Sequence, residues 1–275
     1  MLLAGRNQSL SDQFSIDEIF CLFKDAGYDA LEYCLTDKAF YLKPDTMEDF
    51  FIDHVNRLCK KYDMSISAVC NHRDFTYDDR MFAFMKSAIP KIKRLGTDVL
   101  ITGSSHPGAS MPPFKFQKPN YWEDYRVRLN ELLDFAKPYG VRIAVEPEPN
   151  NFLVSTADYF RMCEEMGRDD LYVNMDICHA YLTDNDMFES IRSLKGRIAH
   201  VHLENIHKGE HLHRLPSDGD MDLRKVFEVF REIGYTGAGA LDFYGEIYRY
   251  EEVSPECVRY LRSVMGEADT GRKDS

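Results

Sequence analysis

The chain has 275 residues, of which 44% are hydrophobic, and it carries a net charge of −12. This length allows one large domain or two small ones, and the apolar content is sufficient for a sizeable core. The acidic charge argues against binding to nucleic acid, because a basic surface supplies most of the affinity for a phosphate backbone. No apolar stretch approaches the 18 residues of a membrane span, so we expect no membrane insertion.

The cysteines and the two ends of the chain give expectations about location and domain limits. Seven cysteines are scattered without a CxxC pair, and the apolar start "MLLAG" is too short for a secretory signal. We therefore expect reduced thiols and a cytoplasmic protein. No linker divides the chain, so residues 1–266 are predicted to form one domain, and the polar segment 267–275 is predicted to be disordered.

A short apolar run followed by an amphipathic stretch recurs along the chain. The apolar runs are predicted strands and cover 1–5, 28–35, 65–70, 98–103, 142–148, 171–178, 197–204 and 237–244. The amphipathic stretches are predicted helices and cover 15–26, 46–62, 78–95, 121–138, 156–167, 185–195, 222–233 and 252–266. Ser155 and Ser254 are predicted helix starts, because serine caps the first backbone N–H groups of a helix.

The order of these elements predicts an α/β fold. Eight units of a strand and a helix, about thirty residues each, imply parallel strands joined by helical crossovers. Eight such units fit a single closed (β/α)₈ (TIM) barrel. A doubly wound open sheet is the alternative, but it usually has a glycine-rich turn after its first strand, and here the sequence is "AGRNQS".

Ionisable residues end four consecutive predicted strands: Glu146, Asp176, His202 and Asp242. The carboxyl ends of barrel strands meet at one rim, where the active sites of such barrels lie. An ionisable group after a buried apolar run is costly unless it is paired or bound to a cation. Three carboxylates at one rim would repel one another strongly without such a cation.

This set of three carboxylates and one imidazole suits one divalent ion. Mn²⁺ is favoured, and Mg²⁺, Co²⁺ and Zn²⁺ are also compatible with these ligands. The competing interpretation is that each residue is an ordinary rim residue with a salt-bridge partner. That interpretation is simple for one residue and harder to sustain for all four.

Four segments carry a family resemblance: "IAVEP", "VNMDICHA", "IAHVHLEN" and "PSDGDMDLRKVFEVFREIGYTGAGALD". In order and spacing they resemble the xylose-isomerase-like superfamily of TIM-barrel sugar phosphate isomerases and epimerases. The resemblance implies an enzyme that isomerises or epimerises a ketose or related sugar by proton transfer through an ene-diolate. It implies a small sugar as the partner and leaves open a homo-oligomeric state.

The resemblance also implies residue roles. Glu146, Asp176 and His202 match metal ligands, and Asp242 stands where the family normally has glutamate. Glu146 and Asp242 would be the acid–base pair, although Asp242 is one methylene shorter than the usual residue.

Several residues outside the ligand set are expected to contact the substrate. His179, three residues after Asp176, would hydrogen-bond a substrate oxygen, and His207 lies in a loop where the family binds substrate. Glu148 would bind substrate hydroxyls or pair with a loop cation. Two further histidines near the ends of the third and fourth strands are assigned to substrate contacts: His72 and His106.

Three alternatives remain open. A dehydratase of the same fold would lose a hydroxyl after the same proton removal. A zinc nuclease of the endonuclease IV type would use His72 and His106 as ligands, with His213 where that family has histidine and His211 where it has aspartate. A non-catalytic sugar-binding barrel is the third.

The stretch "HVHLENIHKGEHLHR" contains five of the nine histidines of the chain. His202 ends the predicted strand and is the expected ligand. His200 lies two residues earlier on the same face, and we expect it to be a hydrogen-bonded residue of a deeper barrel layer. Losing His202 should abolish metal binding, whereas losing His213 should not.

Overall fold

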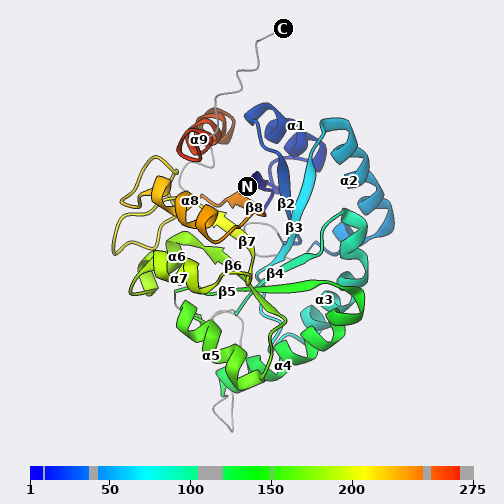
Figure 1. The fold of residues 1–275 in the computed structure, drawn as a ribbon. Coiled ribbons are helices and arrows are strands. Elements are labelled where there is room, and N and C mark those ends of the chain that lie inside the picture. The colour runs from blue at the N-terminus through cyan, green and yellow to red at the C-terminus, as the bar shows by residue number, and fades with distance from the viewer. Residues whose placement is uncertain (9, 37–42, 105–119, 150, 244–248, 267–275) are drawn as a thin grey trace.

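The computed structural model describes residues 1–275 except 9, 37–42, 105–119, 150, 244–248 and 267–275. Within the described residues, eight parallel strands close into a barrel in chain order. Helices surround these strands (Figure 1). The predicted (β/α)₈ barrel is confirmed, and the doubly wound alternative is wrong because β1 pairs with β8. The predicted disordered tail lies outside the described residues.

The strands are short and largely buried. They are β1 Leu2–Arg6, β2 Ala30–Cys34, β3 Ser65–Asn71, β4 Val99–Gly103, β5 Arg142–Glu146, β6 Leu171–Asp176, β7 Ile198–Leu203 and β8 Ala238–Leu241. The predicted run 171–178 is too long, because β6 ends at Asp176 and a short helix begins at Ile177. Asp176 caps that helix by accepting a hydrogen bond from the backbone N–H of His179, and this cap turns the chain.

The helices cover the outside of the barrel. They are α1 Ile16–Ala26, α2 Asp49–Tyr62, α3 Asp79–Ile92, α4 Tyr121–Ala136, α5 Thr156–Met166, α6 Ile177–Thr183, α7 Met187–Ser193, α8 Leu223–Glu232 and α9 Tyr250–Val264. Short 3₁₀ turns follow or precede three of them at Pro44–Met47, Lys93–Leu95 and Lys137–Tyr139. None of the described helices is long and apolar enough to cross a bilayer.

Of the two predicted helix starts, one is confirmed and the other is wrong. Ser155 caps α5, and Asp158 bonds back to the Ser155 backbone, so the capping box is complete. The predicted start at Ser254 is wrong, because α9 begins at Tyr250 and Pro255 lies inside it. Pro255 lies beyond the first turn of α9, so the helix lacks the hydrogen bond that an N–H at this position would make to the Glu251 carbonyl.

Strand alternation places small residues beneath charged ones. Three alanines form a separate buried cluster: Ala4, Ala30 and Ala240. Each stands two residues before an ionisable residue: Arg6, Glu32 and Asp242. Because alternate residues of a strand share a face, the charged side chains lie on the same face as this alanine layer, nearer the carboxyl ends. Large apolar side chains between the strands and helices form the main core.

Candidate metal centre

The predicted ligands lie together at the carboxyl ends of consecutive strands. Glu146 ends β5, Asp176 ends β6, His202 lies in β7, and Asp242 directly follows β8. All four are buried, with exposures between 0% and 5%. Their convergence on one rim follows from the parallel, closed topology.

His202 is the centre of this group. Its Nδ1 lies 3.3 Å from Glu146 Oε2, 3.6 Å from Asp242 Oδ2 and 3.7 Å from Asp176 Oδ2. Neither His202 Nδ1 nor Asp176 Oδ2 has a hydrogen-bond partner among the described residues, and both atoms are buried. Unpartnered buried polar atoms are rare in folded proteins, and one explanation for them is an ion that they ligate.

The proton on His202 can be located from its other nitrogen. Nε2 lies 2.9 Å from Glu32 Oε2. An ionised carboxylate only accepts hydrogen bonds, so Nε2 carries a hydrogen and the Nδ1 of the neutral ring holds a lone pair. This lone pair faces three carboxylates, and the arrangement needs a cation. Burial alone would lower the pKa of His202, but Glu146 and Glu32 raise it well above its usual range, so either a proton or a metal ion can occupy Nδ1.

Glu32 and Arg6 support the centre from β2 and β1. Glu32 is fully buried and accepts from Arg6 Nε at 2.8 Å as well as from His202. Arg6 also pairs with Asp242 through its NH1 group. Burial alone would raise the pKa of Glu32, but Arg6 and His202 hold it well below its usual range. A carboxylate behind a ligating histidine fixes the ring orientation and raises its basicity as a ligand.

Glu146 has a polar environment on each side. Its Oε2 accepts from Asn174 Nδ2 at 2.6 Å, and its Oε1 lies 3.5 Å from His179 Nδ1. Burial would raise the pKa of Glu146, but His202 and His72 lower it to about 2. The carboxylate is therefore ionised at neutral pH and can act as a ligand or as a base.

Three histidines form a second group beside the centre. His179 Nδ1 lies 3.1 Å from the Pro147 carbonyl and His213 Nδ1 lies 3.0 Å from the Asp242 carbonyl, so both Nδ1 atoms carry hydrogens. Their Nε2 atoms then face each other at 3.2 Å and must share a proton or another cation. The exposed His211 ring lies 5.1 Å from the His179 ring and 5.6 Å from the His213 ring.

The other predicted substrate contacts are placed at different distances from the centre. His72 lies at its edge, 3.7 Å from Glu146 Oε2 and 3.3 Å from an Arg6 nitrogen. Glu148 is partly buried and accepts from Asn151, and burial together with the nearby carboxylates raises its pKa to about 7. His207 is instead paired with Asp220 in its own loop. His106 lies outside the described residues.

The predicted ligand set leaves out three buried polar residues at or just beneath this rim: Glu32, Asn174 and Glu204. Glu32 lies within β2, Asn174 lies two residues before Asp176, and Glu204 lies two residues after His202. Because alternate residues of a strand share a face, this spacing indicates that they point toward the same side as the predicted ligands. Glu204 is fully buried, and its Oε2 has no partner among the described residues. Burial, with Asp176 nearby, raises its pKa well above its usual range.

Comparison with known proteins identifies the family. The family described as "Xylose isomerase-like TIM barrel" matches residues 20–263. The chain belongs to this family. The resemblance predicted from the four segments is thus confirmed, and the match covers seven of the eight strands, β2 to β8.

Several curated relatives of this xylose isomerase-like protein are sugar enzymes. A 2-oxo-tetronate isomerase of Haemophilus influenzae is 28% identical over 137 residues, which cover 48% of this chain and 52% of that protein. An inosose dehydratase of Clostridium tetani is 25% identical over 199 residues, with coverages of 65% and 62%. A fructoselysine 3-epimerase of Shigella flexneri is 22% identical over 161 residues, with coverages of 58% and 56%. The chain spans between 52% and 62% of the length of these relatives.

Solved structures share the fold over nearly the whole chain. A protein named IolI, solved with a zinc atom, gives a TM-score of 0.74 at 20% identity and covers 97% of this chain and 98% of that one. A D-psicose 3-epimerase of Clostridium cellulolyticum H10, solved with D-tagatose, gives a TM-score of 0.72 at 15% identity and covers 96% and 99%. Several groups of buried histidine and carboxylate side chains at the rim could hold a metal ion.

Proposed function

We propose that the chain is a divalent-metal-dependent isomerase or epimerase that acts on a ketose or related sugar, free or phosphorylated. The observation that carries this proposal is His202 Nδ1, which has no hydrogen-bond partner among the described residues and faces three buried carboxylate oxygens. The relatives named as a 2-oxo-tetronate isomerase and a fructoselysine 3-epimerase support the reaction class.

Glu146, Asp176, His202 and Asp242 would hold the ion. Three oxygens and one imidazole nitrogen fit Mn²⁺ best, and Mg²⁺, Co²⁺ or Zn²⁺ would also fit. When bound, the ion supplies Lewis-acid polarisation of a substrate carbonyl, which acidifies the neighbouring C–H bond.

The side chains of this protein would then move the proton. Glu146, which is buried and ionised, takes it from carbon and leaves an ene-diolate. Return to the adjacent carbon isomerises the sugar, and return from the opposite face by Asp242 epimerises it. His179, beside both Glu146 and Asp176, would hydrogen-bond a substrate oxygen. His72 and Glu148 line the same rim and would contact other hydroxyl groups.

A dehydratase is the second candidate, because the inosose dehydratase relative has the largest coverage among the three relatives described. It requires the same proton removal by Glu146. The C–O bond of the hydroxyl group on the next carbon would then break, and the leaving hydroxyl would take up a proton and depart as water. The first step is therefore common to both candidates.

The zinc nuclease alternative is supported by the group of His179, His211 and His213, and by two further groups that could each hold an ion: His72, Glu146 and His202, and Asp176, Glu204, His213 and Asp242. Against it stand the net charge of −12 and the all-histidine set, since His211 occupies the place of an aspartate. We therefore propose a sugar, and not a nucleic acid, as the partner. We also propose a cytoplasmic location, in keeping with seven free cysteines.

Elemental analysis and solvent exchange test the proposal. The protein purified with Mn²⁺ should hold about one ion per chain, and incubation with a panel of ketoses in D₂O should place deuterium next to the carbonyl. Glu146→Gln should keep the fold and lose exchange by about 10²- to 10⁴-fold, the usual contribution of a general base.

Each alternative has its own readout in the same experiment. Enone absorbance would identify a dehydratase, and cleavage of abasic DNA with about three zinc ions per chain would identify the nuclease. Absence of exchange across the panel, with a sugar still bound, would identify a binding protein and overturn the enzymatic proposal.

A further inference from the structure

A chain of hydrogen bonds runs beneath the candidate metal centre and ends on Glu146. Ser67 Oγ lies 3.1 Å from His200 Nε2, and His200 Nδ1 lies 3.2 Å from Asn174 Oδ1. Asn174 Nδ2 lies 2.6 Å from Glu146 Oε2. Asn174 and His200 are fully buried. The expectation that His200 is a hydrogen-bonded residue of a deeper layer is confirmed.

The direction of each bond is fixed by chemistry. The Glu146 carboxylate can only accept, so the Asn174 amide nitrogen donates to it and the Asn174 amide oxygen points to His200. That oxygen also only accepts, so His200 carries its hydrogen on Nδ1. His200 Nε2 then accepts from the Ser67 hydroxyl. Glu32 Oε2 lies 3.6 Å from His200 Nδ1 and is the weaker partner.

This chain gives the two oxygens of Glu146 different surroundings. Oε2, bonded to Asn174, is the oxygen that faces His202 Nδ1 at 3.3 Å. Oε1 lies on the other side, 3.5 Å from His179 Nδ1. A carboxylate held by one oxygen cannot rotate to offer both to the same partner. The short bond from Asn174 therefore selects which oxygen faces the ligand group.

We propose that Asn174 is a positioning residue for proton transfer. It holds Glu146 Oε2 among the metal ligands and leaves Oε1 directed at the substrate as the base. This inference rests on the proposed function and gives a role to a residue outside the proposed ligand set. Without the Asn174 amide, Glu146 can turn both oxygens toward the ion, which keeps the ion bound and removes the base.

The test compares catalysis with metal affinity in the same protein. Asn174→Ala removes the donor, and Asn174→Asp keeps the shape but replaces the donor with a like charge. Mn²⁺ affinity is measured from the loss of the free-ion EPR signal, and kcat from deuterium exchange into the ketose. The control is Ser67→Ala, at the far end of the chain, and urea unfolding reports the stability of every variant.

We expect both Asn174 variants to lose about 10- to 100-fold in kcat, the range for changes behind a metal ligand. In Asn174→Ala the Mn²⁺ dissociation constant should stay within about threefold of wild type, and Ser67→Ala should change kcat by less than about threefold. Equal losses of kcat and Mn²⁺ affinity in Asn174→Ala, or full activity in Asn174→Asp, would overturn the inference alone. Wild-type protein that binds no Mn²⁺ or exchanges no C–H bond would overturn the proposed function as well.

Discussion

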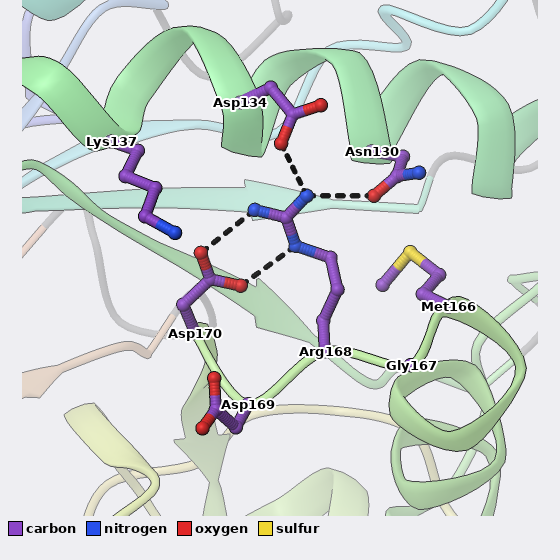
Figure 2. A pocket seen from close by; sticks show the side chains of 8 residues that line it. All are labelled: Asn130, Asp134, Lys137, Met166, Gly167, Arg168, Asp169 and Asp170. Atoms are coloured by element: carbon purple, nitrogen blue, oxygen red, sulfur yellow. Dashed lines mark hydrogen bonds and ion pairs between the residues drawn. The ribbon is translucent and has the colours of Figure 1, made fainter.

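Two clusters of ionisable side chains lie at opposite ends of the barrel, and they differ in how completely their charges are paired. At the N-terminal ends of the strands, Arg168 lies just before β6 and lines a surface pocket (Figure 2). Its guanidinium donates to both oxygens of Asp170 at 2.7 and 2.8 Å, and also to Asn130 and Asp134 (Figure 2). These partners are partly open to solvent, and the guanidinium holds the pKa of Asp170 below its usual range.

At the carboxyl ends of the strands the charges do not balance. Among the described residues, five buried carboxyl groups lie here, and the buried guanidinium of Arg6 pairs with only the first and last of them: Glu32, Glu146, Asp176, Glu204 and Asp242. Three of their neighbouring buried atoms have no partner among the described residues: Asp176 Oδ2, His202 Nδ1 and Glu204 Oε2. A surface hollow lined by paired charges is explained by its contribution to the fold. Buried polar atoms that converge without partners indicate a functional site.

The largest expected effect comes from removing the central ligand. His202→Ala should weaken Mn²⁺ binding by more than about 100-fold, beyond the range of changes behind a ligand, because it removes the nitrogen that all three carboxylates face. Isothermal titration with Mn²⁺ measures this. His213→Ala is the control and should keep the ion, since His213 is not in the proposed ligand set and its Nδ1 donates to the Asp242 carbonyl. Equal losses in both variants would contradict the assignment.

A smaller effect is expected from Glu32, whose carboxylate accepts a hydrogen bond from the proposed ligand His202. Glu32→Gln should lower Mn²⁺ affinity by about 10- to 100-fold, because the amide holds the His202 ring less firmly and makes it a weaker ligand. It should also destabilise the fold, since Arg6 loses a buried partner. Titration and urea unfolding measure the two effects. Unchanged Mn²⁺ affinity would mean that Glu32 serves only Arg6.

The rim should also make stability depend on pH through Glu148. Its folded pKa is about 7, above the value of 4.5 for the free side chain, so the folded state disfavours its ionised form. The penalty is absent below pH 4.5, grows between 4.5 and 7, and is complete above 7, where it reaches about 3 kcal/mol. Urea unfolding of chelator-treated wild type and Glu148→Gln measures it. Stability curves that stay parallel from pH 4.5 to 8 would contradict this expectation.

The smallest expected effect belongs to the opposite end. Arg168→Gln should cost about 1–2 kcal/mol in the free energy of unfolding, because its ion pairs are partly solvated. Mn²⁺ affinity and kcat should not change. A fall in Mn²⁺ affinity or in kcat would contradict the contrast between the two clusters. It would mean that the Arg168 pocket affects the candidate metal centre from the opposite end of the barrel.

The sequence predicted which side chains lie at the rim because strand ends can be recognised locally. An acidic residue or histidine that follows an apolar run marks the end of a buried strand, and this located Glu146, Asp176, His202 and Asp242. Period-two alternation also placed His200 correctly beneath His202. Local patterns were weaker at element boundaries, where the cap at Asp176 ended β6 early and α9 began before Ser254.

By itself, then, the sequence determined the barrel, the rim and the types of side chain that lie there, because apolar periodicity and residue chemistry are local properties. Only the tertiary structure decided which atoms face one another. Glu32 and His202 are 170 residues apart and meet because the barrel closes. Closure likewise places Arg6 of β1 beside Asp242 after β8, and adjacent strands place Asn174 beside Glu146. A periodic pattern gives the face on which a side chain lies, whereas its hydrogen-bond partner depends on the register between strands.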